Sequence, residues 1–283
     1  MSASNRSVLR AVSILKAFHF RDEFVSVSEV SRRAGLPFAS THRLLHALEQ
    51  TGAVEKGDGG AFRLGFLIAS LARNVDIDDC LCKASQDLMA DFSQKFDVTV
   101  SLGRLEGNMV TIIARVLTAA SRQRFAAVGS QLAAYSVALG RVMLADLSER
   151  RLDATLKDLT LDPLTPHTMT SKSRLVEELA MVRKLGYAVV REEIYVGLGC
   201  VAVPIHDHDG RVIAAMSASQ KVEKLTPENV ALLRSELLKL AAVLMKKILP
   251  DLPVDDHKAG SADKDRLSAS RTAVSEASGA IIV

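Results

Sequence analysis

The apolar positions of residues 28–51 fall into two short runs at helical spacing, separated by a turn at Gly35. Ser28 is a suitable N-cap for the first run, and Glu29 would lie in its first turn, where the helix dipole favours negative charge. Gly35 can take the left-handed conformation that ends a helix, and Pro37 suits the first turn of the next one. The pattern therefore predicts two helices joined by a sharp turn.

The second of these helices has two different faces. Leu44, Leu45 and Leu48 recur at helical spacing and predict a buried rear face. The opposite face, near the N-terminal end, offers one aromatic side chain and otherwise small, polar or basic ones: Phe38, Ala39, Ser40, Thr41, His42 and Arg43. A helix of this kind, held across a turn that contains glycine, is typical of the helix-turn-helix that enters the DNA major groove. A plain surface hairpin of two helices would show the same pattern, so the flanking segments decide between the two interpretations.

The segment before residue 28 predicts a further helix over residues 5–19. Its apolar stripe is predicted to consist of Val8, Ala11, Val12, Leu15 and Phe18. Arg6 and Arg10 would then face a partner. Val25 and Val27 alternate like a short strand.

The segment after residue 51 predicts a β-hairpin. Short extended runs at 53–56 and 61–64 flank Gly57-Asp58-Gly59-Gly60, a turn composition that is typical of hairpins. Helix, helix-turn-helix and hairpin in this order indicate a winged helix. Lys56 and Arg63 flank the hairpin tip, where they could contact the phosphate backbone.

The rest of the chain predicts a second, α+β domain. Helices are expected at 77–96, 136–146, 149–158 and 172–185 and from Thr226 onward, and strands at 98–104, 109–116, 187–191, 200–206 and 211–219. An antiparallel sheet flanked by helices and joined to a winged helix suits a ligand-sensing domain. Residues 65–75 form a short apolar helix that reads as a linker and suits pairing with a second protomer.

These elements give a domain division. We expect a winged helix-turn-helix DNA-binding domain over 1–64, a linker helix over 65–75 and an effector-binding domain over 76–250. Residues 251–283 are rich in Ser, Ala, Asp and Lys without apolar periodicity, and this predicts a disordered tail.

Composition restricts the class of protein further. The chain is 48% hydrophobic, which is enough for a sizeable core. Trp is absent and aromatics make up 4%, which argues against recognition of single strands by stacking. Three cysteines give no disulfide framework and suit a reducing compartment. No signal peptide and no run of about 18 apolar residues is evident, so we expect a cytoplasmic protein without a membrane partner.

The distribution of charge supports a nucleic-acid partner. The net charge of the chain is only +3, but residues 1–75 hold ten Lys or Arg against six Asp or Glu. The positive excess therefore lies on the segment that carries the helix-turn-helix, as attraction to phosphate requires.

Other candidate chemistry is weakly supported. Cys80 and Cys82 are two apart on a helix and would point away from each other, and the run from His206 to Asp209 reads as a hairpin turn. Glu192 and Glu193 are neighbours that would point apart. No phosphate-binding glycine loop is present, so we predict no metal and no cofactor.

Several stretches resemble the IclR family of transcriptional regulators over about residues 5–248. They are RAVSILKAF, VSEVSRRAGLP, STHRLLHALEQTG, FRLG, AYSVALGRVMLADL, LTPHTMT and the run from LGYAVVREEIYVGLGC to IAAMSAS. The segment VGSQLAAYSVALGRVMLA further resembles members of the family branch that controls the breakdown of aromatic acids such as protocatechuate and 4-hydroxybenzoate.

The resemblance implies a homodimer or a dimer of dimers that binds palindromic double-stranded DNA. Family recognition helices commonly place a basic residue after GLP, where this chain has Phe38, so its base preference departs from the family pattern. Contact of Phe38 with a thymine methyl is an alternative. We expect Ser40, Thr41 and Arg43 to carry most contacts. The full predicted DNA-binding set is Arg6, Ser28, Phe38, Ala39, Ser40, Thr41, His42, Arg43, Lys56 and Arg63.

The resemblance also implies a GAF- or profilin-like second domain that binds a small organic acid between the 135–141 junction and the late strands. A helix N-terminus suits a carboxylate, and Ser217 and Ser219 alternate onto one strand face. Arg122 and Arg124, in the preceding loop, could clamp a carboxylate. The predicted effector set is Arg122, Arg124, Tyr135, Ala138, Leu139, Gly140, Glu192, Leu198, Cys200, Ser217 and Ser219.

Two functions follow. The first is a sequence-specific regulator whose second domain senses a small organic acid, with aromatic acids and their breakdown products as the narrower expectation. The second is a cytoplasmic enzyme that acts on a small acid through Cys200, with the winged helix as an interaction module. No nucleophile motif surrounds Cys200, so the first is preferred and no catalytic residue is predicted.

Overall fold

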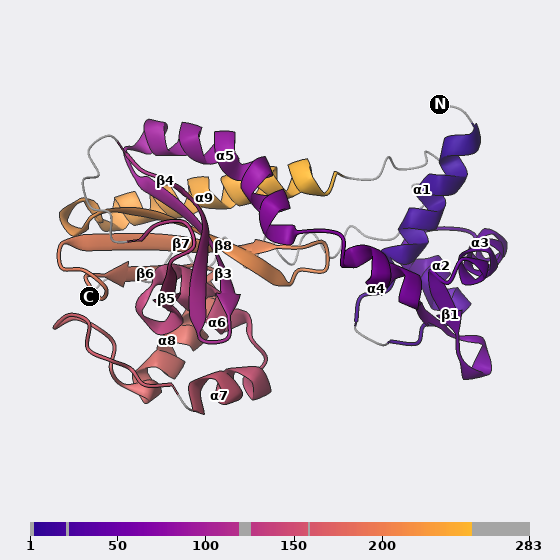
Figure 1. The fold of residues 1–283 in the computed structure, drawn as a ribbon, viewed down its shortest axis with the longest axis horizontal. Helices are drawn as coiled ribbons and strands as arrows, with labels where there is room; N and C mark the ends of the chain where they lie inside the picture. Colours follow the sequence, from indigo (N-terminus) through magenta and orange to yellow (C-terminus); the bar gives the residue numbers. More distant parts are fainter. Residues whose placement is uncertain (1–2, 21–22, 119–125, 158, 251–283) are drawn as a thin grey trace. The chain divides into compact units, whose positions relative to one another are not determined.

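The computed structural model describes residues 3–20, 23–118, 126–157 and 159–250 (Figure 1). The first part of the chain contains α1 (Ala3–Leu15), α2 (Val27–Ala34), α3 (Phe38–Gln50), β1 (Val54–Lys56), a 3-10 turn (Asp58–Gly60), β2 (Phe62–Leu64) and α4 (Phe66–Ala72). The second part contains α5 (Ile77–Phe96), β3 (Thr99–Glu106), β4 (Met109–Val116), β5 (Gln131–Ala133), η2 (Ala134–Ser136), α6 (Ala138–Asp146), α7 (Glu149–Lys157), α8 (Lys172–Leu185), β6 (Ala188–Arg191), β7 (Leu198–His206), β8 (Val212–Lys221), η3 (Val222–Lys224) and α9 (Pro227–Ile248). The predicted tail lies outside the described residues.

Helices α2 and α3 form the predicted helix-turn-helix, with shifted caps. Ser26 caps α2 by accepting a hydrogen bond from the Glu29 amide, so the prediction that Ser28 is the cap is wrong. The helix begins at Val27, which also removes Val27 from the predicted strand. Gly35 ends α2 with φ +65°, the left-handed conformation that the sequence indicated. The sequence predicts Pro37 in the first turn of α3, but Pro37 is the N-cap and so lies one position before the first helical residue.

The buried stripe of α1 differs from the predicted one. Ile14 of α1 is buried in the core of the winged helix together with Ala17 and Phe18, which follow the helix, whereas Val8 is 62% exposed. From the predicted stripe, Phe18 is buried and Leu15 is partly buried against the same core. Apolar residues occur on more than one side of this segment, so periodicity alone could not decide which side packs against α2 and α3.

The hairpin forms as predicted within one residue at each end. β1 and β2 are antiparallel, with Glu55 opposite Arg63 and Lys56 opposite Phe62. Val25 forms a bridge with Phe62, which ties the segment before α2 to the hairpin. Phe62 is buried beside Leu45 of α3, so the wing packs on the rear of the recognition helix.

The second part is built on a six-stranded antiparallel sheet with the order β5-β4-β3-β8-β7-β6. Helices α5 and α9 cover one face, and α6 and α8 lie on the other (Figure 1). Alternation along β3 and β7 sends Val100 and Val203 toward α5 and α9, while Ala202 faces α6. The predicted α+β class with an antiparallel sheet is confirmed. β5 and η2 were missed because each contains only three residues.

None of the described helices is both long and apolar enough to cross a bilayer.

The ion pairs of Glu29 on α2 predict how stability depends on pH. Hydrogen bonds from Arg32 and Arg33 lower the pKa of Glu29 from 4.5 to about 2. A carboxylate with a lowered folded-state pKa contributes stability above its unfolded pKa and loses it as pH falls toward the folded value. Glu29→Gln should therefore flatten the loss of stability between pH 4.5 and about 2. Urea unfolding across that window measures it. Arg32→Ala, which leaves the Arg33 bond, should flatten it less, and an unchanged profile for Glu29→Gln would contradict the interpretation.

Candidate functional site

The front of α3 presents a solvent-exposed surface with mixed chemistry. Phe38, Ala39, His42 and Arg43 are exposed, and Ser40 is half-buried. Among the described residues, no ion-pair partner for Arg43 is found, so its guanidinium is available to an external anion. Pro37 supplies no side-chain cap, which leaves first-turn amides of the helix open to a phosphate.

Thr41 does not belong to this surface. Its side chain is fully buried, and its hydroxyl donates to the Pro37 carbonyl at 3.2 Å. The prediction that Thr41 contacts DNA is therefore wrong. Successive residues of a helix are rotated by about 100° about its axis. Ser40 and His42 therefore lie at the edges of the exposed face, while Thr41, between them in the sequence, points toward the other helices.

The remaining predicted DNA-binding residues surround α3. Ser28 is exposed in the first turn of α2, Arg6 is exposed on α1, and Lys56 is exposed at the end of β1. Arg63 instead pairs with Glu55 across the hairpin, with Nη2–Oε2 at 2.7 Å, and lies over the Phe24 ring. Its charge is partly compensated within the wing.

A separate pocket lies between the sheet and the start of α6. About 470 Å³ of space between protein atoms lies in it, including solvent space at its open mouth. The lining consists of Ser101, Ile112, Arg115, Ala126, Leu132, Val137, Ala138, Leu139, Ile194, Leu198, Cys200, Ser217 and Ser219. The predicted residues Ala138, Leu139, Leu198, Cys200, Ser217 and Ser219 are thus brought together.

The polar groups of the pocket form an ordered row across the sheet. Arg115, Ser101 and Ser217 occupy directly opposed positions on β4, β3 and β8. Two residues along β8, Ser219 lies opposite Cys200 and accepts a hydrogen bond from its thiol at 3.1 Å. Ser217 and Ser219 share the pocket face, as the alternation predicted.

The electrostatics of the pocket favour an anion. Arg115 donates to the Ala126 carbonyl, and burial lowers the pKa of its guanidinium, which still stays charged at neutral pH. No Asp or Glu occurs among the described lining residues. Burial raises the pKa of the Cys200 thiol, so this group is a neutral hydrogen-bonding partner rather than a thiolate.

Three predicted effector residues do not line the pocket. The Tyr135 ring is buried, and its hydroxyl donates to the Asp162 carbonyl at 2.9 Å. A Cβ at Gly140 would lie 2.1 Å from the Ala134 carbonyl oxygen, so this glycine permits close packing of η2 against α6. Glu192 accepts from the Gly197 amide and faces His167 at 3.8 Å. Arg122 and Arg124 lie outside the described residues.

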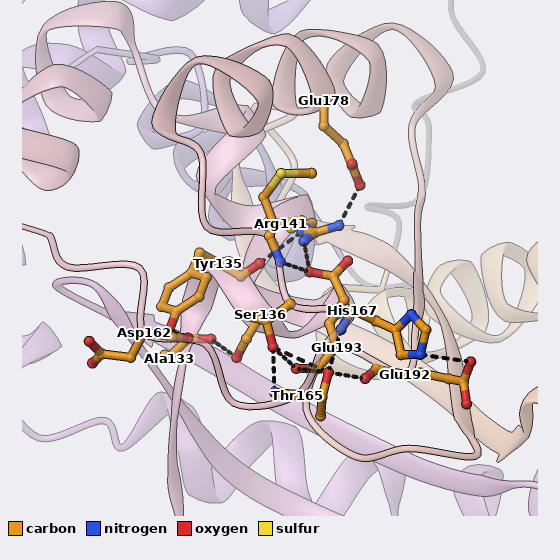
Figure 2. Close-up of polar contacts among 12 residues, drawn as sticks. Ala133, Tyr135, Ser136, Arg141, Asp162, Thr165, His167, Glu178, Glu192 and Glu193 are labelled. Atoms are coloured by element: carbon orange, nitrogen blue, oxygen red, sulfur yellow. Dashed lines mark hydrogen bonds and ion pairs between the residues drawn. The ribbon is translucent and has the colours of Figure 1, made fainter.

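A buried cluster of ion pairs is centred on Arg141 of α6, the helix whose first residues line the pocket. The Arg141 side chain on α6 is 1% exposed and pairs with Glu178 of α8, Nη1–Oε1 at 2.6 Å, and with Glu193 (Figure 2). Its Nε also donates to the Tyr135 carbonyl at 2.8 Å. Figure 2 shows Glu192 and Glu193 pointing apart, as predicted, with Glu193 directed at Arg141.

The same cluster fixes the segment that carries Ile194. Glu193 Oε2 accepts from the Met169 amide at 2.9 Å, and the Thr168 hydroxyl donates to the Glu193 carbonyl at 2.6 Å. Arg141 follows Ala138 and Leu139 on α6, and Ile194 follows Glu193. The ion pair therefore connects two walls of the pocket. Sequence reasoning missed Arg141, although an arginine inside the apolar run VALGRVMLA was a usable signal.

The other candidate groups have contacts within the fold. Cys80 is exposed and Cys82 donates to the Ile113 carbonyl at 3.0 Å. Ligand atoms of Asp207, His208 and Asp209 lie within 4.8 Å of one another, but the Asp207 carboxylate already accepts from the amides of Asp209 and Arg211 in the hairpin turn.

Both the winged helix and the domain that contains the pocket match families of known proteins. Residues 7–58 match the IclR helix-turn-helix domain, and residues 76–245 match the bacterial transcriptional regulator IclR C-terminal domain. The chain thus has the architecture of a DNA-binding transcriptional regulator, and it belongs to the IclR family.

Individual relatives have moderate identity. The regulator XynR of Escherichia coli strain K12 is 28% identical over 86% of this chain and 97% of its own length. The Pca regulon regulatory protein of Pseudomonas putida is 29% identical over 78% of this chain and 76% of its own. A structure of an IclR homologue from Microbacterium hydrocarbonoxydans, complexed with 4-hydroxybenzoate, matches with 26% identity and a TM-score of 0.55, covering 84% of this chain and 98% of that one.

The buried cluster generates a stability prediction. Arg141→Met should lower the free energy of unfolding by about 3–5 kcal/mol, because it leaves buried Glu193 without its counter-charge. Urea unfolding measures the change. The matched control is Arg104→Met, which breaks a half-exposed pair with Asp78 and should cost at most about 1 kcal/mol. Equal losses in the two variants would contradict the role given to Arg141.

The recognition surface generates a second prediction. Arg43→Ala should weaken DNA binding without changing stability, since the side chain is exposed. Thr41→Val should leave DNA contacts intact and lower stability by about 1 kcal/mol, because it removes a buried hydrogen bond. Fluorescence anisotropy with duplex DNA and thermal unfolding separate the two. Loss of DNA binding by folded Thr41→Val would show that this threonine contacts DNA after all.

Proposed function

We propose that this chain is a sequence-specific regulator that binds a palindromic operator as a homodimer or a dimer of dimers. In this proposal residues 1–64 bind DNA, residues 65–75 link the domains and residues 76–250 bind a small organic acid. The protein acts in the cytoplasm. The observation that carries the proposal is the polar row of the pocket, which occurs in a chain whose other part is a winged helix.

The DNA-binding half is supported by the exposed front of α3. Base edges would be reached from Phe38, Ala39, Ser40, His42 and Arg43. Phosphates would be held by the open first turn of α3 and by the groups around it: Arg6, Ser28, Lys56 and, after release from Glu55, Arg63.

Pairing with a second protomer is supported by α4 and the residues after it. Phe66 is 75% exposed, and Leu71 and Val75 are 54% and 57% exposed. Several large apolar side chains exposed this close together in the sequence are typical of a surface that another chain covers.

The effector is proposed to be a small monocarboxylic acid with an apolar body. Arg115 would pair with the carboxylate, with Ser101 and Ser217 as further donors beside it. Ile112, Leu132, Leu139, Ile194 and Leu198 supply apolar walls. An aromatic acid suits this combination, and the relative in complex with 4-hydroxybenzoate and the Pca regulon relative support that narrower choice.

The enzyme alternative has less support. A thiol whose pKa is raised by burial is a poor nucleophile, and no histidine lines the pocket among the described residues. Cys200 is therefore assigned to ligand binding.

The DNA-binding claim is tested by retention of fragmented source-genome DNA on the full chain at near-physiological salt, followed by sequencing. The proposal expects enrichment of one or a few palindromic intergenic sites. Diffuse retention that disappears as salt rises would mean that the winged helix responds only to charge and would overturn the regulator.

The effector claim is tested with 4-hydroxybenzoate and its uncharged amide by calorimetry. The acid should bind the wild type more tightly than the amide, and Arg115→Gln should lose about 10- to 100-fold of acid affinity, as expected for a charge-assisted hydrogen bond. The amide should bind both proteins alike. Arg104→Gln serves as a control outside the pocket. Equal affinity of wild type and Arg115→Gln for the acid would contradict the assignment.

A further inference from the structure

We propose that Phe38 and His42 form the base-reading pair of the recognition helix, and that Phe38 reads the methyl group of a thymine in each half-site. This inference rests on the proposed DNA-binding function. It adds which base the helix selects and through which atoms.

Four rings, three on α3 and Phe62 on β2, form a continuous series. The Phe38 and His42 rings are stacked, with centroids 6.3 Å apart and planes at 20°. The rings of His42 and His46 form a T-shaped contact with centroids 4.7 Å apart, and those of His46 and Phe62 form another with centroids 6.0 Å apart. Phe38, His42 and His46 recur every four residues, so they follow one line on the helix surface.

The series is anchored in the core at one end and exposed at the other. Phe62 is 1% exposed, whereas Phe38 is 56% exposed. The Nδ1 atom of His46 lies 2.9 Å from Oε2 of Glu49, and this contact fixes the His46 ring between His42 and Phe62. Phe38 and His42 are therefore held in place before DNA arrives, and little side-chain entropy is lost on binding.

The chemistry of phenylalanine restricts what it can read. Its side chain neither donates nor accepts hydrogen bonds, so it gains nothing from the N7, O6, N6, N4 or O4 atoms of the major groove. The apolar group that an unmodified base edge presents there is the thymine C5 methyl. An exposed, pre-positioned phenylalanine at the first residue of the recognition helix therefore selects thymine.

His42 supplies the hydrogen-bonding half of the pair. Its side chain lies one turn along α3, roughly 5–6 Å from that of Phe38 at the Cβ atoms. Base pairs are stacked at about 3.4 Å, so His42 reaches an acceptor one or two base pairs from the thymine. Arg43 lies about 100° further around the helix and is left to a phosphate or a guanine.

The experiment uses an operator obtained from genomic selection. Each thymine of a half-site is replaced singly by deoxyuridine, which removes only the C5 methyl, and binding to the full chain is followed by fluorescence anisotropy. One thymine per half-site should be sensitive, and its replacement should weaken wild-type binding about fourfold, the factor for one buried methyl group. Phe38→Ala should bind the thymine operator more weakly and should not respond to that replacement.

Further variants separate recognition from folding. His42→Ala should bind more weakly and should still respond to deoxyuridine at the Phe38 thymine, by a smaller factor because Phe38 loses the ring that it stacks on. Phe38→Arg, taken through the same selection, should enrich guanine at that position. Phe20→Ala removes another exposed phenylalanine, outside the recognition helix, and should change neither affinity nor response.

The outcomes are distinguishable from failure of the proposed function. If selection enriches no site, the regulator itself is contradicted. If a site is enriched but no thymine responds to loss of its methyl, or if Phe38→Ala keeps the full response, the assignment of Phe38 is overturned while DNA binding stands.

Discussion

The buried charge of Arg141 is the constraint on which the ligand domain depends. A guanidinium at 1% exposure requires counter-charges, and these come from α8 and from the segment after β6. Satisfying it brings Glu193 against α6 and thereby places Ile194 opposite Ala138 and Leu139. Three segments distant in the sequence meet at this one cation, and two of them carry residues that line the pocket.

The pocket and the recognition helix share a design. In each, polar groups that face outward are held in position by contacts behind them. Arg115, Ser101 and Ser217 are aligned by strand register, and His42 is aligned by a ring series that ends in the core. Fixed groups of this kind lose little entropy when a partner binds, so a small ligand or a few base pairs can produce specific affinity.

Much of the fold followed from local pattern. The ends of α5 and α8, the hairpin and the left-handed Gly35 could be predicted because spacing, caps and turn composition act over a few residues. Long-range packing could not be predicted in this way. Ser40 and Thr41 are adjacent polar residues, yet contact with the other helices fully buries only Thr41. In the pocket, alternation identified Ser217 and Ser219, whereas Arg115 became evident only through its register with Ser101.

Control of DNA binding by an acid requires that the pocket and the winged helix are linked in free energy. Linkage requires that each changes the affinity of the other by the same factor. The most direct measurement is the dissociation constant of the operator with and without saturating acid, together with that of the acid with and without operator. If the two sites are linked, the two factors should be equal and about 5 to 150. Affinities that are unchanged in both directions would contradict the linkage.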